Sequence, residues 1–302
     1  MGLAESMRQY RAEVDVQSGE RLFHYAKNNR GITEREPMQP GGMFRTSGLY
    51  NLCAREEVLA YKFDIIRTWH KDAGLQITLD IGHLFHDLYR DVYFGPMGEW
   101  IGAWRCIHCG WDTDIAGLSQ PPVSDGGCQF GGLMAKMPDK CGSCHAPFHV
   151  HPDTGEQGAG TFKEWKIEDR KIGLSGHVDG WCLSPFKKRV LTDLKSHGHR
   201  GFGSRKSLRM GHGEQVLGYN YMTGDKGGEV WYLNKSPWGD HPAFIRSVKV
   251  PYDEAILKSK VLVPLRSIQE GLHGGAIPER LCVNSEVPRA EQCQLCDICF
   301  NV

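Results

Sequence analysis

Gly176-His177-Val178-Asp179-Gly180, followed thirteen residues later by Asp193-Leu194-Lys195, is the stretch of sequence that decides the fold. Each of the two pieces has the composition of a β-strand. Side chains alternate between the two faces of a strand, so Asp193 and Lys195 project on the same side. If the two strands pair, Asp179 lies beside Asp193, and two carboxylates and one ammonium group share a small volume.

Two carboxylates with an adjacent lysine suit the metal-assisted hydrolysis of phosphodiesters. Mg²⁺ and Mn²⁺ prefer carboxylate oxygens, with water and phosphate oxygens in the remaining positions. Such an ion polarises a phosphoryl oxygen and lowers the pKa of bound water, while a nearby lysine orients that water and offsets charge at phosphorus. Asp179 and Asp193 are therefore candidate metal ligands, and Lys195 is a candidate catalytic residue. An isolated Asp-x-Lys is more often a solvent-exposed pair, so the assignment depends on further motifs.

Further motifs flank these stretches in a fixed order. Gly82-His83-Leu84-Phe85-His86 precedes them, and Gln215 and Tyr219 follow. The ordered set, over about residues 45–235, resembles the RecB-like branch of the PD-(D/E)XK nucleases, and within it the iron–sulfur exonucleases of CRISPR adaptation and recombination complexes. The resemblance implies that His86, rather than His83, is a third metal ligand. It also implies that Gln215 and Tyr219 hold the scissile strand. Many members carry Glu in place of Asp193, and either carboxylate binds a metal.

The resemblance implies an α/β fold of the restriction-endonuclease type, with a central mixed sheet flanked by helices. The implied activity is that of a metal-dependent DNA exonuclease, a hydrolase acting on single-stranded DNA or DNA ends in recombination, repair or replication. The alternative is a non-catalytic zinc and iron–sulfur scaffold that binds DNA within a nuclease–helicase complex. The sequence has no P-loop motif, so a motor would have to be a separate helicase or recombination protein.

Two Cys-x-x-Cys pairs, Cys106 with Cys109 and Cys141 with Cys144, interrupt the nuclease-like motifs. Four thiolates complete a tetrahedral zinc site, and the long spacing between the pairs fits a ribbon with a Gly/Pro/Ser-rich loop. The segment is therefore predicted to be an inserted zinc ribbon. A redox dithiol pair and a second iron–sulfur site are the alternatives.

Cys293, Cys296 and Cys299 follow one another at two-residue intervals near the C-terminal end, with Cys282 ahead of them. Three cysteines at this spacing favour an iron–sulfur cluster. The resemblance supplies Cys53 as the fourth ligand, so that a [4Fe-4S] cluster would join the C-terminal segment to an early helix. Two alternatives stay open: Cys282 replaces Cys296 as a ligand, or the site holds zinc.

The motifs divide the chain into four predicted parts. These are an N-terminal helical part of the nuclease domain (1–104), the zinc ribbon (105–151), the catalytic sheet (152–280) and a cluster segment (281–302, with Cys53). Hydrophobic periodicity predicts helices over 47–71, with Ser47 as N-cap, 79–94, 214–222 and 253–272. Strands are predicted over 161–169, 230–233 and 244–250.

A basic stretch follows the Asp-x-Lys motif. Eight Lys and Arg residues stand against one acid between Lys187 and Arg209, which predicts contacts with DNA phosphates. The candidate DNA-binding residues are Arg200, Arg205, Lys206 and, after a later strand, Lys235. Glu164, about fifteen residues before Asp179, is read either as a secondary active-site acid or as a solvated strand residue.

Charge and composition restrict how the chain could bind DNA, contact a membrane or use its cysteines. The formal net charge of the 302 residues is zero, so DNA affinity has to come from a local patch. No apolar run approaches the roughly 18–20 residues of a membrane span, and the N-terminal residues do not resemble a signal peptide. We therefore expect a cytoplasmic protein without membrane contacts. Eleven cysteines in such a chain favour metal sites over disulfides.

Overall fold

The structure is a computed structural model, and it describes residues 32–70, 73–113, 135–149, 158–183, 189–198, 202, 207–209, 211–235 and 245–302. Within these ranges, no helix has both the length and the apolar character needed to cross a membrane.

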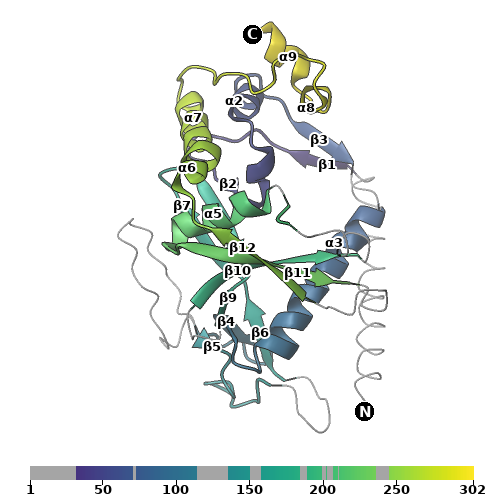
Figure 1. The fold of residues 1–302 in the computed structure, drawn as a ribbon, viewed down its shortest axis with the longest axis vertical. Helices are drawn as coiled ribbons and strands as arrows, with labels where there is room; N and C mark the ends of the chain where they lie inside the picture. Colours follow the sequence, from purple (N-terminus) through teal and green to yellow (C-terminus); the bar gives the residue numbers. More distant parts are fainter. Residues whose placement is uncertain are drawn as a thin grey trace.

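A mixed sheet occupies the middle of the molecule (Figure 1). Its strand order is β12 (Ile245–Pro251), β11 (Gly227–Asn234), β10 (Arg189–His197), β9 (Trp181–Leu183), β4 (Trp100–Cys106) and β5 (Ala135–Lys136). A seventh strand, β6 (Gly160–Lys163), lies outside this order and pairs with β4. Strands β10 and β11 are parallel, and the other neighbours are antiparallel. The prediction of an α/β fold with a central mixed sheet is confirmed.

The two motif strands do not pair with each other, contrary to the sequence prediction. The first, β8 (Leu174–Val178), lies in a separate three-stranded sheet between β2 (Phe44–Arg45) and β7 (Trp165–Asp169). The second, β10, pairs with β9 and β11. The single strand predicted over 161–169 is likewise two strands, β6 and β7, which belong to different sheets and meet at Glu164.

Helices cover both faces of β10. On one face, α5 (His212–Thr223) packs in the core cluster that contains Leu191. On the other face, Leu194 packs with Tyr89 and Phe94, which belong to the π-helical segment η2 (Leu88–Phe94) that continues α3 (Ala73–Asp87). The alternation of strand side chains thus assigns Leu191, and with it Asp193 and Lys195, to the face that α5 covers.

The early helix is shorter than predicted. A 3₁₀ segment, η1 (Thr46–Asn51), precedes α2 (Ala54–Lys62), whose N-cap residue is Cys53 rather than Ser47. The helix cannot continue past Asp64 because that residue has a φ of 51°. The chain instead enters β3 (Arg67–His70), which pairs antiparallel with β1 (Ile32–Arg35).

The late helical region agrees with the prediction and leads into the C-terminal segment. It consists of α6 (Glu254–Leu257), the π-helical segment η3 (Lys258–Leu262) and α7 (Val263–Leu272). Beyond it, α8 (Pro288–Glu291) and α9 (Cys296–Asn301) lie close to α2 (Figure 1).

Reciprocal side-chain bonds fasten this C-terminal segment to α2 and its approach. Buried Arg55 of α2 donates hydrogen bonds to the carbonyl oxygens of Cys299 at 3.2 Å and Val302 at 2.9 Å. In the opposite direction, Arg289 donates to the carbonyl oxygens of Asn51 and Leu52, both at 3.1 Å. These four hydrogen bonds attach the C-terminal segment to the early helix.

Candidate active site and metal centres

Asp179 lies in the connection from β8 to β9 and is held against β10. Its Oδ2 atom accepts a hydrogen bond from the N–H of Leu194 at 2.8 Å, and the N–H of Thr192 donates to the carbonyl of Gly180 at 2.9 Å. The Trp100 indole N–H donates to the Asp179 carbonyl at 3.1 Å. The acid therefore reaches β10 although its own strand belongs to the other sheet.

Asp193 and Lys195 form an ion pair on the same face of β10. The Lys195 Nζ atom lies 2.7 Å from Asp193 Oδ2 and 3.0 Å from Oδ1. The Asp193 side chain is buried, with 1 % of its surface exposed, and that of Lys195 is 23 % exposed. Lys195 is thus the more exposed member of the pair.

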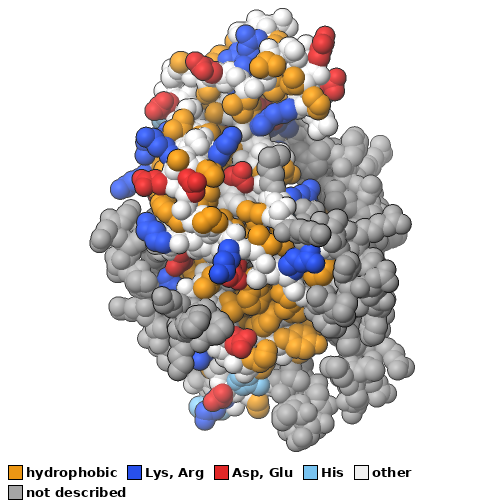
Figure 2. All heavy atoms as spheres, in the orientation of Figure 1, with side chains coloured by type: hydrophobic (Ala, Val, Ile, Leu, Met, Phe, Trp, Pro, Cys, Tyr) orange, Lys and Arg blue, Asp and Glu red, His pale blue; other side chains and the backbone are white. Residues whose placement is uncertain are grey.

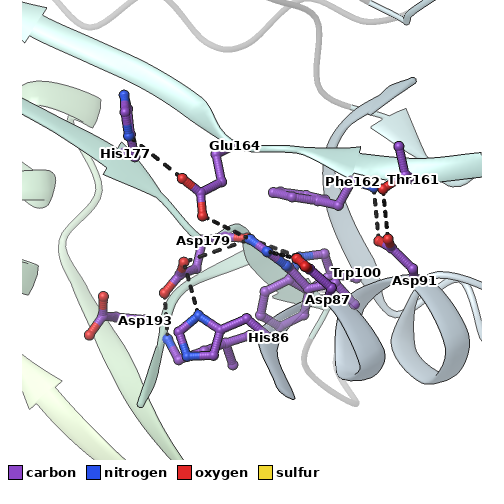
Figure 3. Close-up of polar contacts among 12 residues, drawn as sticks. His86, Asp87, Asp91, Trp100, Thr161, Phe162, Glu164, His177, Asp179 and Asp193 are labelled. Carbon is purple, nitrogen blue, oxygen red and sulfur yellow. Dashed lines mark hydrogen bonds and ion pairs between the residues drawn. The ribbon is translucent and has the colours of Figure 1, made fainter. Parts of the chain in front are cut away.

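His86 approaches Asp179 from α3. The His86 Nδ1 atom lies 3.8 Å from Asp179 Oδ1, and Figure 3 shows the imidazole directed at that carboxylate. His83 is exposed, so of the two histidines in the helical motif it is His86 that faces the acids. The structure thus gathers His86, Asp179, Asp193 and Lys195 around one place.

Gln215 and Tyr219 lie on one face of α5 and bond to each other. Gln215 Nε2 donates to the Tyr219 hydroxyl at 2.9 Å, and that hydroxyl donates to the His177 carbonyl at 2.6 Å. Both side chains are buried. Tyr219 therefore contacts the main chain of β8, two residues before Asp179. The resemblance, by contrast, implies that Tyr219 contacts the DNA strand directly.

Sequence reasoning missed Arg90, whose side chain is only 3 % exposed. Its Nη2 atom donates to Asp87 Oδ1 at 2.7 Å, and its Nη1 atom lies 3.7 Å from Asp179 Oδ1 and 3.6 Å from Glu164 Oε1. A signal was present, because Arg90 stands four residues after His86 and so shares its helical face. Glu164 itself is 45 % exposed and lies near Arg90 rather than alone in solvent.

The electrostatics of the site favour a bound cation. Burial, reinforced by the charge of Asp179, raises the pKa of Asp193 to about 7 against the effect of Lys195. Burial would also raise the pKa of Asp179, but the groups around it, His86 and Lys195 foremost, lower it. Burial lowers the pKa of His86 to about 4, so the imidazole is neutral near pH 7 and its lone pair is available to a metal.

The donor set of two carboxylates and an imidazole fits Mg²⁺ or Mn²⁺. The four acids Asp87, Glu164, Asp179 and Asp193 face only the two cations Lys195 and Arg90. The group is therefore short of positive charge, which a divalent ion would supply. Among the described residues, only the four ribbon cysteines are gathered tightly enough for their ligand atoms all to lie within 4.8 Å of one another. His86, Asp179 and Asp193 are more widely spaced than that.

Those four cysteines, Cys106, Cys109, Cys141 and Cys144, form a compact thiol cluster. The Sγ distances are 3.6 Å for Cys106 to Cys144 and 3.5 Å for Cys109 to Cys141. Four sulfurs bound to one zinc at about 2.3 Å would lie about 3.8 Å apart, so the spacing fits a tetrahedral ion. The N–H groups of Ser143 and Cys144 each donate to Cys141 Sγ at 3.3 Å. Burial would raise the pKa of Cys141, but these bonds lower it to about 6.

The remaining predicted cluster ligands line a second, wider site. A pocket of about 1080 Å³ lies between the C-terminal segment and the start of α2. The half-buried cysteines on its wall are Cys53, Cys282, Cys293, Cys296 and Cys299. These thiols are not gathered as tightly as those of the ribbon, and their spacing is wider than one tetrahedral ion requires.

The predicted DNA contacts are covered only in part. Arg200, Arg205 and Lys206 lie outside the described residues. Lys235 follows β11; its N–H donates to the His197 carbonyl at 2.8 Å and its Nζ to the Thr78 carbonyl at 3.3 Å. On the face shown in Figure 2, Lys and Arg side chains are mixed with acidic ones.

Comparison with known proteins gives distant likenesses. No protein-family model matches the chain, and no curated protein sequence matches it significantly. An alkaline exonuclease from Laribacter hongkongensis, LHK-Exo, is 11% identical with a TM-score of 0.38, over 78% of this chain and 90% of its own. The structure of SSO0001 is 12% identical with a TM-score of 0.37, over 95% of this chain and 96% of its own. At these values, function has to be argued from the geometry of this chain.

Proposed function

We propose that this protein is a metal-dependent DNA exonuclease that hydrolyses phosphodiester bonds. The observation that carries the proposal is the convergence of Asp179, Asp193 and Lys195 with His86, although two separate sheets and a helix supply them. Buried neighbouring carboxylates are costly to maintain without a cation, and a binding or structural role alone gives no reason to keep them beside a partly exposed lysine.

Each side chain has a proposed role. His86, Asp179 and Asp193 hold Mg²⁺ or Mn²⁺, which when bound polarises the scissile phosphate and lowers the pKa of a water. Lys195 orients the attacking water and offsets negative charge at phosphorus. Gln215 is the candidate contact to the scissile strand, while Tyr219 keeps the β8 main chain, and through it Asp179, in position.

The substrate and process are proposed from the resemblance to the RecB-like nucleases that the ordered sequence motifs carry. We infer action on single-stranded DNA or DNA ends, in recombination, repair or replication, with DNA supplied by a separate helicase or recombination protein. Arg200, Arg205, Lys206 and Lys235 are the proposed phosphate contacts.

We also propose two further metal centres. The ribbon cysteines bind Zn²⁺, since their spacing matches one tetrahedral ion. A [4Fe-4S] cluster occupies the C-terminal pocket through Cys53, Cys293, Cys296 and Cys299. Cys282 lines the same pocket and is the alternative to Cys296.

The proposal is tested by nucleotide release from end-labelled single-stranded DNA with Mn²⁺, using end-blocked and unblocked oligonucleotides. Wild type should produce a ladder of products, and Lys195→Ala should not. Lys249→Ala provides a matched control, because Lys249 is an exposed lysine on the edge strand β12 of the same sheet. If wild type and Lys195→Ala are equally inert, the scaffold alternative replaces the nuclease.

A further inference from the structure

Arg90 occupies the centre of a group of three carboxylates. Asp87 comes from the end of α3, Glu164 from the junction of β6 and β7, and Asp179 from the turn after β8, and Figure 3 shows these three acids converging. The guanidinium lies within 3.7 Å of an oxygen of each of them, and its carbon sits 4.7 Å from the Phe162 ring centroid.

The contact between Arg90 and Asp179 is electrostatic rather than a hydrogen bond. Nη1 and Nε of Arg90 are buried and make no hydrogen bond within the described residues. Asp179 Oδ2 is occupied by the Leu194 N–H, so Oδ1 faces both Nη1 of Arg90 at 3.7 Å and Nδ1 of His86 at 3.8 Å. This oxygen therefore has a ligand-like imidazole on one side and a fixed cation on the other.

Enzymes that use two metal ions place the ions about 3.5–4 Å apart and bridge them with shared oxygens. A second ion here would have to bind between Asp179 Oδ1 and Glu164, the two acids that flank Arg90 Nη1. The guanidinium already fills that position with one positive charge. Arginine keeps its charge under ordinary conditions, so it repels a second divalent ion at any working pH.

We propose that Arg90 is a positioning residue that takes the place of a second metal ion, orients Asp179, and restricts the site to one divalent cation on the His86 and Asp193 side. The inference rests on the proposed function, because it assigns the number of ions to the same site. It also assigns Glu164 a role as a partner of Arg90 instead of a metal ligand.

The test counts Mn²⁺ bound by the full chain, from the loss of the free Mn²⁺ EPR signal. The soft thiolates of the two cysteine centres do not favour Mn²⁺, so they do not add to the count. Wild type should bind one ion that Asp193→Asn loses, and Glu164→Gln should still bind one. Arg90→Gln should bind two, with the spectrum of a coupled Mn²⁺ pair. Arg90→Lys, which keeps the charge, should return the count to one, and Arg90→Gln/Glu164→Gln should also bind one.

Two results overturn the inference while leaving the nuclease intact: wild type binds two ions and Glu164→Gln one, or a folded Arg90→Gln variant still binds one. If Arg90→Gln fails to fold, the ion counts of wild type and Glu164→Gln decide. One ion in each supports the inference, and two ions in wild type with one in Glu164→Gln reject it. Equal Mn²⁺ binding by wild type and Asp193→Asn would instead remove the metal site and with it both proposals.

Discussion

The Oδ2 atom of Asp179 accepts the main-chain N–H of Leu194 at 2.8 Å, so the first acid of the site is fixed by the strand that carries the second. This bond replaces the strand pairing that the sequence suggested. The two oxygens of Asp179 therefore have different surroundings. Oδ2 is bonded to the main chain of β10, and Oδ1 faces His86.

Substitution of Asp179 should therefore separate stability from metal binding. Asp179→Asn keeps an amide oxygen for the Leu194 N–H but removes one negative partner of Arg90, which retains Asp87 at 2.7 Å. It should therefore melt below wild type but above Asp179→Ala. Asp179→Ala leaves that buried N–H without a partner, which costs about 1–3 kcal/mol. Both variants should lose Mn²⁺ binding and DNA cleavage, measured by EPR and nucleotide release. Global unfolding of Asp179→Asn would mean that the residue is structural.

The metal-free protein should lose stability as the pH rises toward and beyond 7. Because the pKa of Asp193 is raised to about 7 when folded, the folded state holds a proton that the unfolded state has released above about 4. This contribution is fully present only below the unfolded pKa of about 4, and it is lost progressively as the pH rises from there through the folded pKa of about 7. Thermal melts from pH 5 to 8 measure the slope.

Asp193→Asn should flatten that slope. In the wild-type protein at pH 8, added Mn²⁺ should restore the stability that the metal-free form has lost. Burial also raises the pKa of Asp91 to about 6 and lowers the pKa of His86 to about 4. These two shifts give stability slopes of opposite sign between about pH 4 and 6, so the variant should show little net slope. An unchanged pH profile in Asp193→Asn would locate the titration elsewhere.

Gly180→Ala should disrupt the site through a clash with Trp100. Gly180 has a φ of +146°, and an added Cβ would lie 2.3 Å from the Trp100 indole nitrogen. That nitrogen holds the Asp179 carbonyl, so the substitution should both destabilise the fold and weaken Mn²⁺ binding. Gly198→Ala is the control, because a Cβ there meets nothing within 4 Å. Equal melting temperatures for the two variants would contradict the argument.

Removal of zinc should destabilise the central sheet, because β4 runs from the sheet directly into the first cysteine pair. Elemental analysis should find one zinc per chain in wild type, and none in Cys141→Ser. The variant should also melt at a lower temperature. Full zinc content in Cys141→Ser would exclude the four-cysteine site.

The two ligand sets proposed for the cluster make opposite predictions. If Cys296 is a ligand, anaerobically purified Cys296→Ala should lose the brown colour and visible absorbance, and Cys282→Ala should keep them. Cys53→Ala should lose them in either case. A colourless wild-type protein that contains only zinc would reject the cluster.

The sequence predicted the site better than the arrangement that forms it. Alternation along β10 correctly put Asp193 and Lys195 on one face, because strand periodicity is a local property. Sheet membership is not local, so nothing in Gly176–Gly180 revealed that β8 belongs to another sheet. The end of α2 depends on the positive φ of Asp64, which a periodic pattern does not show.

Arg90 escaped notice for a related reason. Its importance comes from Asp87, Glu164 and Asp179, two of which are distant in sequence. Its spacing from His86 placed it near the site, but its ion pairs with Glu164 and Asp179 form only when folding brings those residues together. The clustering of the four ribbon cysteines was easier to predict, since the Cys-x-x-Cys spacing is a local property of the sequence.

The bonds made by Arg55 and Arg289 have a practical meaning for the proposed iron–sulfur cluster. They tie the C-terminal thiols to the helix that begins at Cys53, around one pocket. Loss of either arginine should therefore separate the two sets of thiols and reduce the iron that the protein retains.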